Sequence, residues 1–230
     1  MCYARLGDVV PNWPMRIKRL VHGLDPYAHF NALKGRIGCI FQNDRLLPWR
    51  SAIDNVLLPR EILGNRDREA YRTAADLLAR FGLEGFENAR PSELSGGMRQ
   101  RVAVARALAS DPDVLLADEA FGHLDEATGE QLRRDFKATA EQGRKAVLHV
   151  THSIDEALDL GDRIVVLGRP GKVLATLDNF DRNEKNRSAV RAKIRECLDV
   201  GGWENRVRPQ ISNETDAKLA QILSASQARR

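Results

Sequence analysis

The sequence has few cysteines and no long apolar run, and each absence narrows the class of protein. Its cysteines are odd in number and widely spaced (Cys2, Cys39 and Cys197), so we expect isolated reduced thiols and neither a disulfide framework nor a metal cluster. No apolar stretch approaches the roughly 18 residues of a membrane-spanning helix, and the first residues carry no signal-peptide pattern. These observations predict a soluble cytosolic protein.

Length and charge give broader bounds. The 230 residues suit one domain, or one domain with a small lobe, and they contain no internal repeat. The net charge of +4 arises from residues 181–230, because positive and negative residues before them balance. A basic segment of this density is more typical of a solvated surface than of a nucleic-acid or lipid interface. We therefore expect no nucleic-acid partner.

The segment Leu94–Arg101 combines a serine, two glycines and the start of an amphipathic helix. Ser95 can cap this helix, and Gly96 and Gly97 let a ligand approach the backbone without a Cβ clash. The free N–H groups of the first turn attract anions, so the segment predicts a phosphate-binding turn. The alternative is a loop that only caps a core helix. The helix itself is supported by an apolar stripe: Met98, Val102, Ala105 and Ala109.

A short apolar run, Val114–Ala117, predicts a strand buried on both faces. It ends in Asp118 and Glu119, at the carboxyl end of a strand, where open α/β sheets place their chemistry. With this order and spacing the chain resembles the nucleotide-binding subunits of ABC transporters. The resemblance makes Leu94–Arg101 the signature motif and Leu115–Glu119 the Walker B strand.

The resemblance implies an α/β fold of the P-loop NTPase type, a mostly parallel sheet with an inserted helical lobe. Residues 1–34 would be a degenerate or truncated N-terminal part of the ATPase core, including its first strands and phosphate loop. Residues 35–180 would be the ABC ATPase domain, with the helical lobe at about 50–112, and residues 181–230 a basic C-terminal tail.

Gln42 follows the predicted strand Gly38–Phe41 and matches the family's Q-loop, whose glutamine reaches the metal and the attacking water. In the family the next residues face the membrane partner. Here Leu46–Trp49 resembles the importer subgroup associated with nitrate, sulfonate and taurine. The alternative is that Trp49 only packs against the helix that follows.

Two helices are predicted after the Q-loop. The first begins near Ser51, which forms a capping arrangement with Asp54, and the second runs from about Asp67 to Phe81 and ends at Gly82. By resemblance they belong to the lobe that docks on a transmembrane subunit. Their apolar residues are interpreted as core first and interface second: Ile53, Val56, Leu57, Ala70, Ala74, Leu77, Leu78 and Phe81.

His152 follows a third predicted strand, Ala146–Val150, and precedes a helix predicted at Ile154–Leu160. It matches the family's switch histidine, which contacts the γ-phosphate, whereas His149 is interpreted as a packed or paired residue of the strand. Asp125 matches the D-loop acid that links two active sites, with a helix N-terminal acid as the alternative.

The last part of the chain predicts a closing hairpin and one helix. Arg163–Leu167 and Lys172–Thr176 read as the two strands, joined by a Gly- and Pro-containing turn. Within the tail, four residues can line one face of a helix: Val190, Ile194, Cys197 and Leu198.

One motif of the family is missing. The phosphate loop G-x-x-x-x-G-K-[ST] occurs nowhere in the sequence, and Asp8–Ile17, which stands in its place, has two prolines and no glycine. Losing three charge-assisted contacts of about 1.5–3 kcal/mol each weakens nucleotide binding from micromolar to millimolar or worse. Either the start of the chain is truncated or frame-shifted, or this subunit's own loop has degenerated.

The resemblance implies ATP hydrolysis with Mg²⁺ at a site shared by two subunits. Asp118 and Gln42 would bind the metal, Glu119 would polarise the attacking water, and Gln42 and His152 would assist it. Five residues would contact the nucleotide: Ser95, Gly96, Gly97, Gln100 and Asp125.

The implied partners are a second ATPase subunit, the permease subunits of an importer and, indirectly, a substrate-binding protein, at the inner face of the cell membrane. One alternative is a non-hydrolysing partner that lends its signature motif to an intact subunit, and another is a non-functional truncated copy. An ATPase of the chromosome-maintenance type is disfavoured, because the span from Gln42 to Leu94 is too short for long coiled-coil heptads.

Overall fold

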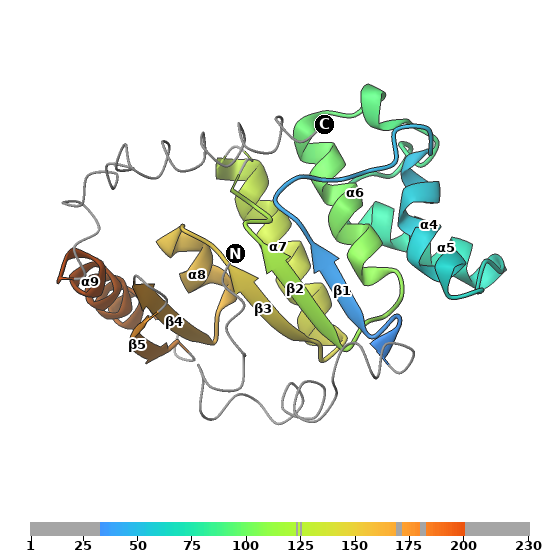
Figure 1. Cartoon of the computed structure of the whole chain (residues 1–230). Helices are drawn as coiled ribbons and strands as arrows, with labels where there is room; N and C mark the ends of the chain where they lie inside the picture. The colour runs from blue at the N-terminus through green and yellow to red at the C-terminus, as the bar shows by residue number, and fades with distance from the viewer. Residues whose placement is uncertain (1–32, 123, 125, 169–171, 180–182, 201–230) are drawn as a thin grey trace, which may run out of the picture.

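The computed structural model describes residues 33–122, 124, 126–168, 172–179 and 183–200 (Figure 1). Apart from its last two residues, the expected N-terminal part at 1–34 lies outside this range. The same holds for Asp125, for most of the turn expected between the hairpin strands, and for the tail beyond residue 200.

A three-stranded parallel sheet lies at the centre, as predicted. Its strands β1 (Ile37–Ile40), β2 (Val114–Asp118) and β3 (Ala146–Val150) pair in that order. They form from short apolar and β-branched runs without proline, which suit a buried sheet. One row of register partners runs across all three strands: Ile40, Ala117 and His149. All three strands therefore end at the same edge of the sheet.

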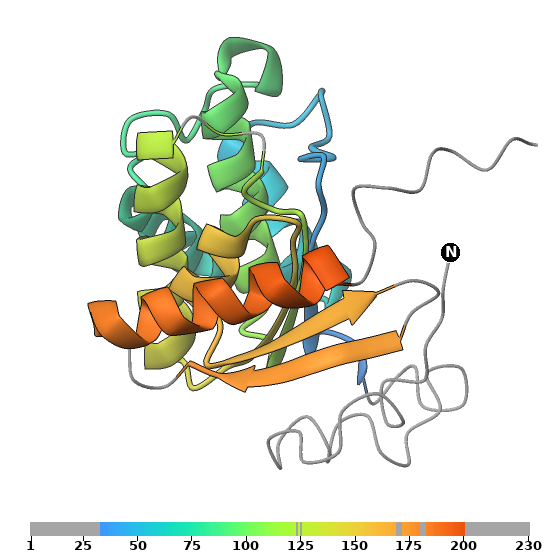
Figure 2. The same cartoon turned by 90° about the vertical axis from the view of Figure 1, so that its left-hand side faces the viewer.

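Helices α6 (Gly96–Leu108) and α7 (Glu126–Gln142) pack against the sheet and against each other. Figure 2 shows them on one side of the sheet together with the helices of the lobe. The main core lies between these layers. Its largest fully buried side chains include Ile40, Leu57, Leu78, Phe81, Leu115, Phe121, Leu132 and Phe136.

The helical lobe contains α4 (Ala52–Ile62), α5 (Arg68–Arg80) and a short 3-10 turn, η1 (Pro91–Glu93). Ser51 and Asp67 cap α4 and α5 by accepting a hydrogen bond from the N–H three residues on, which confirms both predicted starts. The lobe packs through α4 and α5 onto α6, so the signature helix belongs to both parts of the fold.

The C-terminal unit consists of α8 (Ile154–Leu160), the antiparallel strands β4 (Arg163–Gly168) and β5 (Lys172–Asp178), and α9 (Glu184–Val200). The predicted hairpin is confirmed. A second core joins its elements, and it includes the face predicted for the tail helix: Leu158, Ile164, Val166, Val190 and Ile194, with Cys197 and Leu198 partly buried. The first part of the expected tail is thus a packed helix. Among the described residues no helix combines the length and apolarity needed to cross a membrane.

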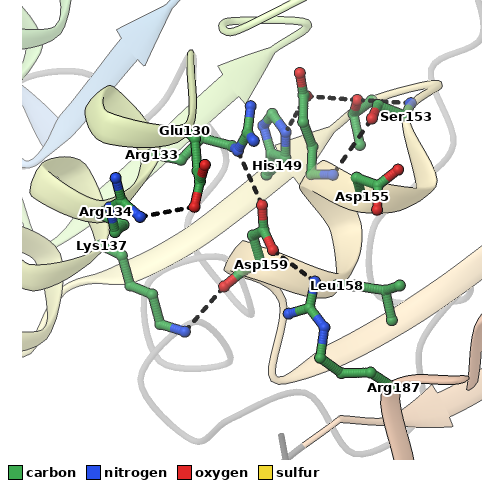
Figure 3. A network of polar contacts seen from close by, with 12 residues as sticks. Glu130, Arg133, Arg134, Lys137, His149, Ser153, Asp155, Leu158, Asp159 and Arg187 are labelled. Atoms are coloured by element: carbon green, nitrogen blue, oxygen red, sulfur yellow. Dashed lines mark hydrogen bonds and ion pairs between the residues drawn. The ribbon is translucent and has the colours of Figure 1, made fainter. Parts of the chain in front are cut away.

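Asp159 joins three helices through charge (Figure 3). Its carboxylate accepts hydrogen bonds from Arg133 Nε of α7 at 3.1 Å and from an Arg187 guanidinium nitrogen of α9 at 2.8 Å. Its backbone carbonyl accepts a third from Lys137 Nζ at 2.9 Å. The helix after the switch segment is therefore held from both sides.

Candidate active site

The carboxyl ends of the three strands bring Gln42, Glu119 and His152 together. Gln42 Nε2 donates to Glu119 Oε2 at 3.0 Å, and His152 Nδ1 lies 3.4 Å from Glu119 Oε1. The two carboxylate oxygens thus face one residue from each neighbouring strand end. Sequence reasoning placed each residue at a strand end, and the structure adds their mutual contact.

Glu119 has an unusual backbone for its residue type. Its φ is +45°, in the left-handed region that favours glycine, while its N–H still donates to Val150 O at 2.8 Å. The turn swings the side chain out of the strand direction and leaves it 34% exposed beside His152, which is 70% exposed. A carboxylate held in this way is open to water and suited to accept a proton from it.

Asp118 ends β2 next to Glu119 and is exposed. Mg²⁺ prefers oxygen ligands and usually takes only one or two from a protein, with water and phosphate completing its shell. The Asp118 carboxylate and the Gln42 amide oxygen meet that requirement. The described residues contain no cluster of three or more His, Cys, Asp or Glu side chains that would form a closed metal cage. The oxygen donors of Asp118 and Gln42 are therefore of the kind that would hold Mg²⁺.

Ser95 caps α6, its Oγ accepting a hydrogen bond from Met98 N at 3.2 Å. Ser95 and Gly96 are exposed and Gly97 is half-buried. A Cβ at Gly96 would come no closer than 3.8 Å to a side chain, and one at Gly97 would meet its neighbours at 3.5 Å, an ordinary contact. The chain itself does not require either glycine for space, so the two glycines leave an open surface over the N–H groups of the first helical turn.

Gln100 lies elsewhere than the sequence led us to expect. We expected it to contact the nucleotide, but it is only 7% exposed, and its Nε2 donates to Ala120 O at 2.6 Å. A longer contact of 3.5 Å reaches Phe41 O. The amide is thus used inside the protein, where it ties α6 to the residues beside Gln42 and Glu119. Asp125, the remaining expected contact, lies outside the described residues.

Asn55 is a site-supporting residue that sequence reasoning missed. It is fully buried in α4, its Oδ1 accepts from Leu47 N at 2.8 Å, and its Nδ2 donates to three carbonyl groups between residues 47 and 51. It therefore fixes the segment after the Q-loop, on which Trp49 is 70% exposed. The available signal was a polar residue within the apolar stripe of that helix.

Contacts to Asp44 secure the same segment from the other side. Arg99 Nε donates to Asp44 Oδ2 at 2.9 Å, and an Arg106 guanidinium nitrogen donates to Asp44 O at 2.6 Å. Burial lowers the pKa of Arg106, although the nearby Asp44 charge opposes this. Both the first and the last turn of the signature helix are thus linked to the Q-loop.

The residue types expected at an ATP site are present only in part. The described residues include the Asp118 and Glu119 carboxylates, the Gln42 amide and the His152 imidazole after the strand ends, and a helix start capped by Ser95. Nothing in the full sequence supplies the glycine-lysine loop that grips the β- and γ-phosphates.

The sequence is similar to those of known proteins. The ABC transporter family model matches residues 17–122. A taurine import ATP-binding protein of Rhizobium johnstonii is 50% identical over 142 residues, which is 61% of this chain and 54% of that protein. A protein of the same description in Escherichia coli is 40% identical over 174 residues, 71% of this chain and 68% of the relative.

A solved dimeric structure of an ATP-binding cassette in a post-hydrolysis state, bound to ADP and Pi, covers 69% of both chains with a TM-score of 0.60 and 36% identity. The chain spans about half the length of several of the curated relatives it matches. Fold, motifs and relatives agree, and the chain belongs to the family of ABC transporter ATP-binding proteins.

Proposed function

We propose that this chain is an ATP-binding and ATP-hydrolysing subunit of an ABC importer for a small anion of the nitrate, sulfonate or taurine type. The contact of Gln42 and His152 with the two oxygens of Glu119 carries the proposal. Relatives named as taurine and aliphatic sulfonate import ATP-binding proteins support the substrate class.

In this function Glu119 accepts the proton of the attacking water, while Gln42 and His152 hold the carboxylate and the water in line. Asp118 and the Gln42 amide oxygen would hold Mg²⁺, which supplies charge neutralisation for the phosphates. Ser95, Gly96 and Gly97 offer N–H groups to the terminal phosphate of a nucleotide bound mainly by a second subunit.

The absent phosphate loop favours a second candidate function, a partner that does not bind ATP firmly itself. Such a subunit would lend its signature turn to an intact subunit and leave one working site of two. A non-functional copy would neither hydrolyse ATP nor support hydrolysis by an intact subunit. The three possibilities differ in whether this chain contributes to turnover in a mixed dimer.

The proposed partners follow from exposed features near the Q-loop. Trp49 and Phe41 are 70% and 42% exposed on the segment between β1 and α4. Because the contacts of Asn55 and Asp44 fix that segment, it can couple movements at the site to the transmembrane subunits of a permease. A cytoplasmic position at the inner membrane face, with a substrate-binding protein on the far side, completes the proposal.

Nucleotide titration and mixed-dimer turnover test the proposal together. Because the phosphate loop is missing, the isolated chain should show negligible affinity for a fluorescent ATP analogue. A micromolar dissociation constant would show that the chain binds ATP firmly without that loop, and it would exclude the second candidate function. Mixed dimers with an intact cassette should hydrolyse ATP, and Glu119→Gln should abolish the turnover that depends on this carboxylate. Glu130→Gln, on the exposed surface of α7, is the matched control and should leave turnover unchanged.

A further inference from the structure

His152 lies on a short turn whose neighbours are both fixed by side-chain hydrogen bonds. Ser153 N donates to Thr151 Oγ1 at 3.0 Å, and Ser153 Oγ caps α8 by accepting from Glu156 N at 3.3 Å. His152 therefore projects into solvent from a backbone that is held immediately before and after it. The Thr151 hydroxyl is thus the group that closes this turn.

The Thr151 hydroxyl is itself held by a buried carboxylate. Thr151 Oγ1 donates to Glu156 Oε2 at 2.7 Å, and His149 Nε2 lies 3.2 Å from the same oxygen. The Glu156 side chain is only 5% exposed. Burial opposes its ionisation, but the hydrogen bonds from His149 and Thr151 outweigh burial and lower the pKa of Glu156. The carboxylate is thus a charged anchor inside the protein.

The position of Glu156 in α8 suggests a simpler role, which its contacts do not fit. As the third residue after the cap Ser153, it could form a capping box by accepting from the Ser153 N–H. That N–H goes to Thr151 instead, and the Glu156 carboxylate is directed to Thr151 and His149. The side chain therefore supports the turn before the helix and not the start of the helix.

His149 connects this anchor to the loop after Glu119. Its ring lies 5.4 Å from the ring of Phe121, and its Nδ1 is buried without a hydrogen-bond partner in the structure. His149 is visible in Figure 3 between α7 and α8, close to the Asp159 contacts. The turn that carries His152 and the loop that carries Glu119 thus rest on the same buried group.

We propose that Glu156 is a positioning residue, which holds Thr151 and thereby sets where His152 lies relative to Glu119. The proposal rests on the proposed function for its catalytic meaning. A misplacement of about 1 Å in such a site can cost a hundredfold in rate, so a short anchored turn has a direct effect on catalysis. The 3.4 Å separation between His152 Nδ1 and Glu119 Oε1 is the distance that the anchor maintains.

Thr151→Val tests this in the full chain, because it keeps the side-chain shape and replaces only the hydroxyl with a methyl group. We expect the Ser153 amide proton to exchange at least about 10-fold faster and ¹⁵N relaxation to report a more mobile His152 backbone. Thr151→Ser restores the hydroxyl and should restore both signals. Thr139→Val is the control, since Thr139 is a buried threonine whose hydroxyl likewise donates one hydrogen bond, to Asp135 O.

In mixed dimers with an intact cassette, Thr151→Val and Glu156→Gln should lower kcat roughly 10-fold with little change in KM, and Thr151→Ser should recover kcat. Unchanged Ser153 exchange and His152 relaxation in Thr151→Val would overturn the positioning role. Absence of turnover in every mixed dimer, including wild type, would instead refute the proposed function. The same NMR signals in Glu156→Gln would still decide whether Glu156 holds the turn.

Discussion

Gln42 Nε2 and Glu119 Oε2 are 3.0 Å apart, although 77 residues separate them in the sequence. The amide is a neutral donor, so it can orient the Glu119 carboxylate without adding a second charge beside it. Its oxygen takes no part in this contact, and a metal ligand would need that oxygen. A carboxylate in place of the amide would alter both properties while changing the shape very little.

We therefore expect Gln42→Glu to lower the turnover of mixed dimers by about 100-fold or more, because two carboxylates would meet where one must accept a proton. Gln131→Glu provides the control, since Gln131 also donates to a carboxylate, Asp135, but on the exposed surface of α7. Equal turnover of the two variants would contradict the role assigned to Gln42. Steady-state ATPase assays give the comparison directly.

Asn55→Ala should destabilise the protein by about 2–4 kcal/mol, because it removes the buried hydrogen bonds that the Asn55 amide makes with the Leu47 N–H and with carbonyl groups of the Q-loop segment. Urea unfolding gives the measurement. Gln131→Ala removes an exposed amide and should change stability by no more than about 0.5 kcal/mol. If both variants unfold at the same midpoint, Asn55 does not hold the segment.

Asp159→Ala should destabilise by about 1–3 kcal/mol, since it leaves Arg133, whose side chain is 12% exposed, without its carboxylate partner. Glu130→Ala breaks an exposed pair with Arg134 on the same helix and should cost about 0.3–0.5 kcal/mol. The difference between their urea midpoints measures how much the Asp159 contacts contribute to stability. A smaller effect for Asp159→Ala than for the surface control would argue against it.

The free energy of unfolding should depend on pH through Glu156. Its folded pKa lies below its ordinary value of 4.5, so its stabilising contribution is complete above that pH and is lost as the pH falls through the folded pKa. Wild type should therefore exceed Glu156→Gln in stability at pH 7, and the gap should shrink in acid. Denaturant titrations of both proteins at neutral and acidic pH test this, and a gap independent of pH would exclude it.

A glycine at position 119 should give a more stable protein than an alanine there, whereas at position 130 the alanine should be the more stable. The left-handed backbone of Glu119 costs an alanine about 1–2 kcal/mol, which a glycine avoids. Glu130 is helical, where glycine is about 1 kcal/mol less stable than alanine. The sign of the Gly-minus-Ala difference in unfolding free energy should thus reverse between the two sites, and the same sign at both would contradict the backbone assignment.

Local patterns predicted most of the elements. The bounds of β3 and α8 agree with the apolar and capping pattern, and the parallel order of the sheet places the predicted strand ends on one edge. The fold and the neighbourhood of Gln42, Glu119 and His152 could therefore be predicted, because periodicity and the resemblance both point to them.

Contacts between distant residues could not be predicted in the same way. Gln100 matches the signature pattern, yet tertiary packing turns its amide inward to Ala120 O. Likewise, the anchors Asn55 and Glu156 act through partners that a pattern within one element does not reveal. Their roles depend on which backbone groups the fold leaves without a partner, and only the assembled structure determines that.

The two apolar cores meet at α8, which contributes Leu158 to the smaller core and packs Leu160 against the larger one. The link from α7 across to α9 runs through polar contacts around Asp159. Because one carboxylate on α8 accepts hydrogen bonds from both α7 and α9, a shift of α8 would disturb its contacts with both neighbours. The segment that carries His152 is thus braced from the C-terminal side by charged contacts as well as by apolar packing.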